Sequence, residues 1–199
     1  MSAVTLAVAS ACAGTVPDDQ GGGAINTGET VTTEGLNWTT DEIADEDIAV
    51  SYPPGWRRST VKLMPFLADP RELVALGTFD LPSGGKNCAH TPGKAIGEMK
   101  PTDALIVIEE RTVAREGWVA TRMDYPKRPL HFGPNDGYSS EAGDCLGQPK
   151  ASLDRIIPFR DSGRRFYAYI ALGDDVPPTI REEAWAILDR LEIGPGGRC

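Results

Sequence analysis

Apolar and polar residues alternate in short runs along much of the chain, a pattern typical of half-buried β-strands. Residues 48–52, Ile-Ala-Val-Ser-Tyr, form one such run, and Pro53-Pro54-Gly55-Trp56 after it predicts a tight turn. Residues 104–108, Ala-Leu-Ile-Val-Ile, are apolar throughout, which predicts a central strand covered on both faces. Shorter runs predict further strands at residues 61–64, 73–79 and 118–121.

The last third of the chain predicts a β-hairpin. Residues 153–159 and 164–172 are the expected strands, with the turn at Asp161-Ser162-Gly163. Successive side chains of a strand point to opposite faces of the sheet. We therefore expect one face of the second strand to carry Phe166, Ala168, Ile170 and Leu172, and the other to carry Tyr167 and Tyr169.

Two helices are expected beside these strands. Thr91-Pro92 resembles an N-cap followed by proline at the first helical position, which predicts a short helix. A second helix follows Pro177-Pro178, and its Thr179 and Glu182 have the spacing of a capping box. The predicted fold class is α+β, an antiparallel β-sheet packed against a C-terminal helix and a short second helix. The C-terminal helix carries one apolar stripe, formed by Ile180, Ala184, Ile187, Leu188 and Leu191.

Composition divides the chain into three parts. Residues 13–46 are rich in Gly, Thr, Asp and Glu and contain hardly any large apolar residue, which predicts a flexible acidic tether. The acidic end of this segment, residues 41–47, lacks the glycine and the spacing of a calcium loop, so we expect a solvated linker there. Residues 1–12 are expected to be a remnant of an export signal, and residues 47–199 a single globular domain.

The excess negative charge lies in the leader. The formal net charge is −9, and residues 1–47 contain nine acids and no Lys or Arg. The remaining residues, 48–199, hold 20 acids and 20 bases and are neutral as a whole. Because nucleic-acid binding depends on clustered Lys and Arg that replace counterions, we expect no nucleic-acid partner.

The chain opens with an uncharged run of small and apolar residues that ends at Cys12. This run resembles the end of a bacterial lipoprotein signal, in which small residues precede a cysteine that is lipidated and becomes the mature N-terminus. Ala9 stands where Leu is usual, and no positively charged region comes first, so we expect a start further upstream or a shortened leader. We expect an extracytoplasmic protein, anchored to the membrane only through lipid at Cys12; a secreted protein with an ordinary signal remnant is the alternative.

The other cysteines fit an exported protein. Cys88 and Cys145 lie in turn-rich parts of the domain, and an oxidising compartment favours a disulfide between them. Closing a loop of that length stabilises the fold by roughly 4 kcal/mol in the chain-entropy model. Cys199 is the last residue and is expected to be free, although pairing of Cys145 with Cys199 stays open. The opposite expectation is a reduced cytosolic protein with unpaired thiols.

The order of these features is similar to that of small exported lipoprotein-like domains from high-GC Gram-positive bacteria. It also resembles, more faintly, the PsbP-like fold of photosynthetic extrinsic proteins and LpqN-type lipoproteins. The resemblance covers roughly residues 48–193 and implies a fold and a location, but no activity or catalytic residue. The motifs that carry it are Tyr52-Pro53-Pro54-Gly55-Trp56, Leu76-Gly77-Thr78-Phe79, Cys88, Asp103-Ala104-Leu105, Cys145, Phe159 and Tyr169-Ile170-Ala171-Leu172-Gly173.

Motifs for specific chemistry are incomplete, so we expect no metal and no cofactor. His90 and His131 lie in loops rich in Pro and Gly, and the sequence has no Gly-x-Ser-x-Gly elbow, so both are expected at the surface. Cys88-Ala89-His90 offers half of a zinc site without a second pair at ligand spacing. Glu109 and Glu110 are adjacent on a predicted strand and point to opposite faces, which excludes them as an acid–base pair.

A tether joined to a domain without a catalytic motif favours a binding module over an enzyme. We expect an exported, membrane-tethered, non-enzymatic module that binds an envelope protein or a cell-wall component. The alternative is a carrier of a small apolar ligand, whose pocket would be lined by aromatic residues that core packing explains equally well. An enzyme would need His90 or His131 in a cleft beside a carboxylate with a perturbed pKa. The aromatic residues in question are Trp56, Trp118, Tyr167 and Tyr169.

Overall fold

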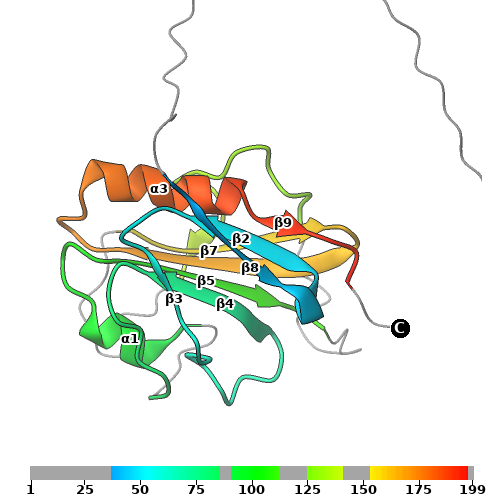
Figure 1. The fold of residues 1–199 in the computed structure, drawn as a ribbon, viewed down its shortest axis with the longest axis horizontal. Helices are drawn as coiled ribbons and strands as arrows, with labels where there is room; N and C mark the ends of the chain where they lie inside the picture. The colour runs from blue at the N-terminus through cyan, green and yellow to red at the C-terminus, as the bar shows by residue number, and fades with distance from the viewer. Residues whose placement is uncertain (1–36, 86–90, 113–124, 141–152, 197–199) are drawn as a thin grey trace, which may run out of the picture. The chain divides into compact units, whose positions relative to one another are not determined.

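The computed structural model describes residues 37–85, 91–112, 125–140 and 153–196. These residues form antiparallel β-sheets and two α-helices, so the predicted α+β class is confirmed (Figure 1). In this part of the chain the strands belong to one six-stranded and one three-stranded sheet.

The larger sheet has the strand order β3-β4-β5-β8-β7-β6, and all neighbours are antiparallel. The central strand β5 is buried at every residue, as the uninterrupted apolar run predicts. The strands are β3 (Arg57–Arg58), β4 (Arg71–Gly77), β5 (Ala104–Glu110), β6 (Tyr138–Ser139), β7 (Leu153–Asp161) and β8 (Arg164–Leu172).

The smaller sheet has the order β1-β2-β9, formed by β1 (Thr39–Ile43), β2 (Ile48–Tyr52) and β9 (Glu192–Ile193). A short 3₁₀ turn, η1 (Ala44–Glu46), joins β1 to β2. The expected tether, which extends to residue 46, is therefore wrong over residues 39–46. Acidic residues of this segment have partners that composition does not reveal: Asp41 accepts hydrogen bonds from the Tyr52 hydroxyl and from Arg58.

The predicted hairpin is confirmed, with a turn one residue shorter than expected. Strands β7 and β8 pair as far as Asp161 opposite Arg164, which leaves only Ser162 and Gly163 in the turn. Both turn residues have positive φ, 49° and 75°, as a two-residue type I′ hairpin turn requires. Turn length sets the register, and hence which side chains of the two strands face each other.

Helices α3 (Pro178–Asp189) and α1 (Gly93–Glu98) cover opposite faces of the larger sheet (Figure 1). Both begin differently from the sequence prediction. Pro177 is the N-cap of α3 and Pro92 that of α1, and neither cap makes a side-chain hydrogen bond. The predicted capping box is therefore absent from α3, because Pro178, with its fixed φ, takes the first helical position.

A hydrophobic core lies on each face of the larger sheet. On the α3 face, Phe166, Ala168, Ile170 and Leu172 of β8 pack with α3 and β2. On the α1 face, Tyr167 and Tyr169 pack with α1 and the residues around it. The predicted division of β8 between two faces is confirmed. The apolar stripe of α3 is confirmed too, since Ala184, Ile187 and Leu188 are buried.

The strand predicted at residues 61–64 is wrong. These residues form irregular backbone between β3 and β4. Leu63 and Met64 are fully buried, and their backbone N–H groups donate to the Glu72 carboxylate at 2.9 Å each. One buried carboxylate thus satisfies the backbone groups that a neighbouring strand would otherwise pair.

Candidate binding surface

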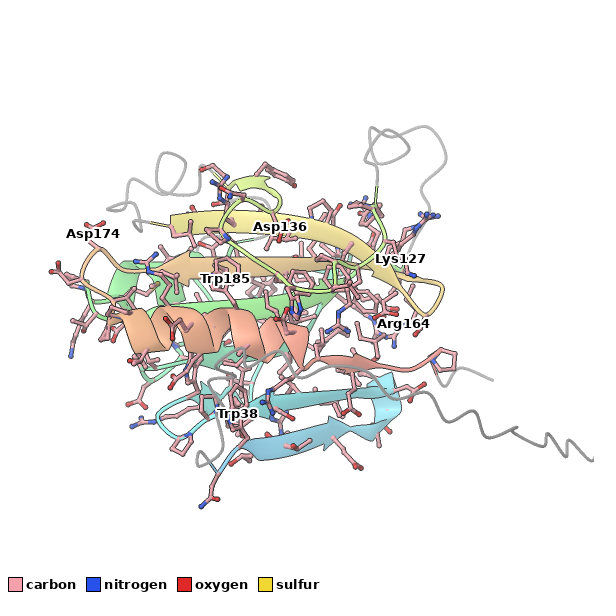
Figure 2. All side chains as sticks on the ribbon, turned by 90° about the horizontal axis from the view of Figure 1, so that it is seen from above. Trp38, Lys127, Asp136, Arg164, Asp174 and Trp185 are labelled. Atoms are coloured by element: carbon pink, nitrogen blue, oxygen red, sulfur yellow. The ribbon has the colours of Figure 1, made fainter. Side chains whose placement is uncertain are left out.

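Basic side chains gather at one end of the larger sheet, where β4 begins, β5 ends and β7 turns into β8. We call this region the hairpin end. Figure 2 places the labelled Arg164 and Lys127 there, close to the β7–β8 turn. Strand alternation divides its cations between the two faces of the sheet. The hairpin end is defined by Arg71, Arg111, Lys127, Arg160, Arg164 and Arg165.

On the α3 face, Glu110 holds two of these arginines. Arg164 Nε donates to Glu110 Oε1 at 2.7 Å, and Arg71 Nε donates to Oε2 at 3.1 Å. Arg71 is also ion-paired with Glu46. Burial by itself raises the pKa of Glu110, but the hydrogen bonds and charges of Arg164 and Arg71 outweigh burial, and the pKa is lowered. Both arginines are therefore neutralised within the protein.

A cleft of about 370 Å³ opens over this cluster. Four arginines (71, 111, 164 and 165) and three acids (45, 46 and 110) line it, which leaves a formal charge of +1. Binding pockets for small apolar ligands are lined mainly by apolar and aromatic side chains. The cleft is instead polar and nearly balanced in charge, and the two arginines in it that bond Glu110, Arg71 and Arg164, serve to hold the fold together.

On the α1 face, four basic residues lie side by side across neighbouring strands. Arg160 of β7 is directly opposite Arg165 of β8, and a parallel β-bridge joins Lys127 to Arg160. Beyond β5, the Arg111 N–H donates to the Arg165 carbonyl at 2.9 Å. We call these four residues the basic row. With strands about 4.8 Å apart, three steps make the row roughly 14 Å long.

Three members of the basic row have no acidic partner within the described residues. Arg111 is ion-paired with Asp69 at 3.1 Å, whereas no ion pair joins Lys127, Arg160 or Arg165 to a carboxylate in that part of the chain. All three side chains are exposed. The Arg165 guanidinium lies 5.9 Å from the centroid of the Tyr125 ring, a cation–π contact that leaves its charge in place. Among the described residues, the row is therefore a surface of uncompensated positive charge. Ion pairs do hold Arg57, Arg58, Arg71, Arg128 and Arg164.

Two carboxyl groups lie next to the basic row on the same face of the sheet, two residues further from the hairpin turn. Glu72 of β4 and Glu109 of β5 are direct cross-strand partners. Glu109 has no exposed surface; burial, and then the charge of Glu72, raise its pKa well above the ordinary value. Burial also raises the pKa of Glu72, although two backbone N–H groups oppose the shift. These contacts favour a neutral Glu109 beside an ionised Glu72.

Tyrosine side chains lie beside Glu72 and Glu109, and together these residues form an inner layer behind the basic row. The Tyr125 hydroxyl hydrogen-bonds the Tyr167 hydroxyl, and the two ring centroids are 5.3 Å apart. Burial and then this hydrogen bond raise the pKa of Tyr125, and burial raises the pKa of Tyr138 to about 12. Both phenols keep their protons at physiological pH. The layer behind the basic row is therefore a polar support that brings little negative charge to the surface.

Several sequence predictions concern residues outside the described part of the chain. Cys12, Cys88 and Cys145 lie outside them, so lipidation and the disulfide stay predictions. Outside them too are His90, Trp118 and Cys199.

His131 lies at the surface, as predicted, with 86% of its side chain exposed. Its Nδ1 is 3.1 Å from Asp189 Oδ2, while Oδ1 of the same carboxylate accepts the Phe132 N–H at 2.7 Å. These contacts hold the loop that contains His131 against the last turn of α3. The arrangement is that of a loop anchor on the surface of the molecule.

Three of the four aromatic residues expected to line a ligand pocket lie in the core instead. Trp56, Tyr167 and Tyr169 are at most 4% exposed. Trp56 also donates its Nε1 hydrogen to Glu183 Oε2 of α3 at 2.9 Å, which ties the turn before β3 to the helix. These three side chains are thus part of the packed core, and the carrier alternative stays a prediction.

Neither a metal cluster nor a membrane span is found in the described part of the chain. It contains no group of three or more His, Cys, Asp or Glu side chains placed to hold a metal ion. The helices of that part are too short and too polar to cross a bilayer.

Sequence reasoning missed the basic row, although part of the signal was present. The hairpin prediction brings Arg160 and Arg165 near the same turn, but only a two-residue turn places them opposite each other. Lys127 and Arg111 join the row through pairings of their own with β7 and β8, which no local pattern marks.

Comparisons with known proteins give no relative for this chain: no family model, curated protein or solved structure matches it. The role of the hairpin end therefore follows from its own geometry and charge.

Proposed function

We propose that this protein is an extracytoplasmic, non-enzymatic binding module, tethered to the membrane through lipid at Cys12, that binds an envelope protein or a cell-wall component. The lipoprotein-like leader and the resemblance to small exported domains, faintly PsbP-like or LpqN-like, support the location. The hairpin end is the binding surface in this proposal.

The observation that carries the proposal is the basic row, three of whose members have no acidic partner in the part of the chain that the structure describes. Like charges directly opposite each other on neighbouring strands destabilise a sheet, so such a pair costs stability unless an anion binds it. Arg160 and Arg165 form such a pair on a domain whose charges otherwise balance. Exposed large apolar side chains are few among the described residues: Val61, Phe66, Leu130 and Tyr138. The described residues therefore offer no large apolar surface as a competing binding site, and the cluster of positive charge makes the hairpin end the best candidate.

The location can be tested in cells that express the chain from its own gene. Wild type and Cys12→Ser are labelled with a fatty-acid probe and fractionated, with Cys199→Ser as the matched control because it also removes one thiol. We expect label and membrane association in wild type and Cys199→Ser, and loss of both in Cys12→Ser. Native protein in the cytosol, with the thiols of Cys88 and Cys145 freely alkylated, would contradict the proposal.

The binding role needs a separate experiment. Purified full-length protein is crosslinked to intact envelopes, and the captured material is compared with that of a variant in which Lys127, Arg160 and Arg165 are changed to Gln. We expect the variant to lose capture of the same envelope component. Equal capture by both proteins would place the binding surface elsewhere.

A further inference from the structure

We propose that the basic row binds a linear phosphate-bearing polymer. The inference rests on the proposed function, because it names the chemical class of the envelope component. Its basis is the arrangement of Lys127, Arg160, Arg165 and Arg111 on one face of the larger sheet.

The backbone hydrogen bonds show how close the central pair of the row lies. The Arg160 N–H donates to the Pro126 carbonyl, and the Arg160 carbonyl accepts the Arg128 N–H, so both groups point away from β8. Arg160 and Arg165 are therefore a non-hydrogen-bonded pair, the type in which side chains approach most closely. Their Cβ atoms are then about 4.5–5.5 Å apart. Two arginine side chains that start from Cβ atoms this close repel each other, and an anion bound between their guanidinium groups relieves the repulsion.

Arginine favours a phosphate as that anion. A guanidinium presents its N–H donors in a planar fork that matches phosphate oxygens, so two neighbouring guanidiniums can hold one phosphate group from both sides. The ring of Tyr125 beneath Arg165 limits the directions open to that side chain. A cation–π contact uses no N–H donor of the guanidinium for a hydrogen bond, so it does not compete with a phosphate for those donors.

The shape of the row favours a chain of phosphates over a single one. Its cations repeat once per strand, at about 4.8 Å, along a line perpendicular to the strands. A linear polyanion laid across β5, β8, β7 and the Lys127 segment would meet a cation at each step. Arg111 is held by Asp69 at one end of this line, so the three cations without an acidic partner among the described residues provide most of the attraction.

The test uses purified full-length protein and long-chain inorganic polyphosphate as the probe, with binding measured by titration calorimetry at several salt concentrations. The row variant carries Lys127→Gln, Arg160→Gln and Arg165→Gln. The matched control carries Lys62→Gln, Lys94→Gln and Lys100→Gln, three exposed lysines elsewhere on the domain. Both variants lose three positive charges, so a difference between them reports position rather than net charge.

We expect wild type and control to bind within twofold of each other, and the row variant to bind at least about tenfold more weakly at low salt. Each phosphate contact contributes about 0.7 to the slope of log K against log salt for a single-stranded polyanion, so the slope of the row variant should be shallower by about 2. Because all three substituted side chains are exposed, circular dichroism should show an unchanged fold. A second variant, Arg160→Lys with Arg165→Lys, keeps the charge and should retain salt-dependent binding while losing part of the affinity of the guanidinium fork.

Several results would overturn the inference: no polyphosphate binding by wild type, equal loss in row variant and control, or tighter binding to anionic vesicles than to polyphosphate. Tighter binding to a single-stranded oligonucleotide would do so as well, since base stacking would then add to the charge contacts. The two proposals fail separately. Capture of an envelope protein without polyphosphate binding refutes only the ligand class, whereas polyphosphate binding by a cytosolic protein refutes only the location.

Discussion

Glu109 and Glu110 are consecutive residues of β5, yet they meet opposite surroundings on the two faces of the larger sheet. Glu110, on the α3 face, is held by Arg71 and Arg164, which lower its pKa. Glu109, on the α1 face, is fully buried opposite Glu72, and its pKa is raised. The α3 face therefore stabilises the charge of Glu110, whereas burial on the α1 face opposes the charge of Glu109.

The same difference separates the arginines of the hairpin end. Arg71 and Arg164 share carboxylate partners on the α3 face, whereas Arg160 and Arg165 face each other on the α1 face with no ion pair to a described acid. An arginine cluster is thus structural where carboxylates accompany it and is available for binding where they are missing. Counting basic residues does not distinguish the two cases.

The largest expected effect on stability comes from removing the charge of Glu110. Glu110→Gln leaves two partly buried guanidinium groups without their shared carboxylate, and we expect unfolding free energy to fall by about 3 kcal/mol. Urea denaturation at neutral pH measures it, with the exposed Glu98→Gln as control, expected within about 0.5 kcal/mol of wild type. Because the pKa of Glu110 is lowered on folding, its contribution is present above the unfolded pKa and is lost as pH falls through the folded pKa. The gap between variant and wild type should therefore shrink in acid, and a gap that grows would refute the ion network.

Glu109→Gln should behave with the opposite sign. The pKa of Glu109 is raised on folding, so the wild type loses stability as pH rises from the unfolded toward the folded pKa. The uncharged amide avoids that loss, so we expect the variant to become more stable relative to wild type as pH rises from about 5 to about 8. Urea titrations of both proteins at the two pH values provide the measurement. A difference independent of pH would mean that Glu109 titrates alike in the folded and unfolded chains.

Tyr167→Phe tests the neutral support beneath the basic row. The substitution removes the hydroxyl that meets Tyr125, and we expect a loss of about 1.5 kcal/mol in thermal or urea unfolding. Tyr138→Phe is the comparison variant, because 38% of Tyr138 is exposed although its hydroxyl belongs to the same layer, and it should cost less than Tyr167→Phe. Equal costs for the two variants would count against a buried tyrosine pair.

The smallest effect concerns the like-charge pair itself. Arg160→Glu replaces a repulsive cross-strand pair with an attractive one, and we expect a gain of about 0.5 kcal/mol in urea unfolding at low salt. High salt should remove most of the gain. Lys94→Glu makes the same change of charge on α1 and should leave stability nearly unchanged. A loss of stability in Arg160→Glu would show that the pair is not repulsive in the free protein.

Local patterns predicted much of the fold because they report periodicity, which depends only on near neighbours in sequence. The alternation in β8 placed Phe166 and Tyr167 on opposite faces, and the stripe of α3 identified its buried side. Local patterns also placed Glu109 and Glu110 on opposite faces of one strand. They could not tell the two carboxyls apart, because their partners come from other strands.

Only the tertiary structure decided what surrounds each charge. Arg71 and Arg164 lie 39 and 54 positions from the Glu110 that joins them, and β1 obtains partners that its acidic composition conceals. The basic row depends on a two-residue turn and on the pairing of β7 with the Lys127 segment, both of which set register rather than periodicity. The sequence by itself determined which face each side chain points to, while strand register decided which side chains meet there, because register depends on contacts between distant segments.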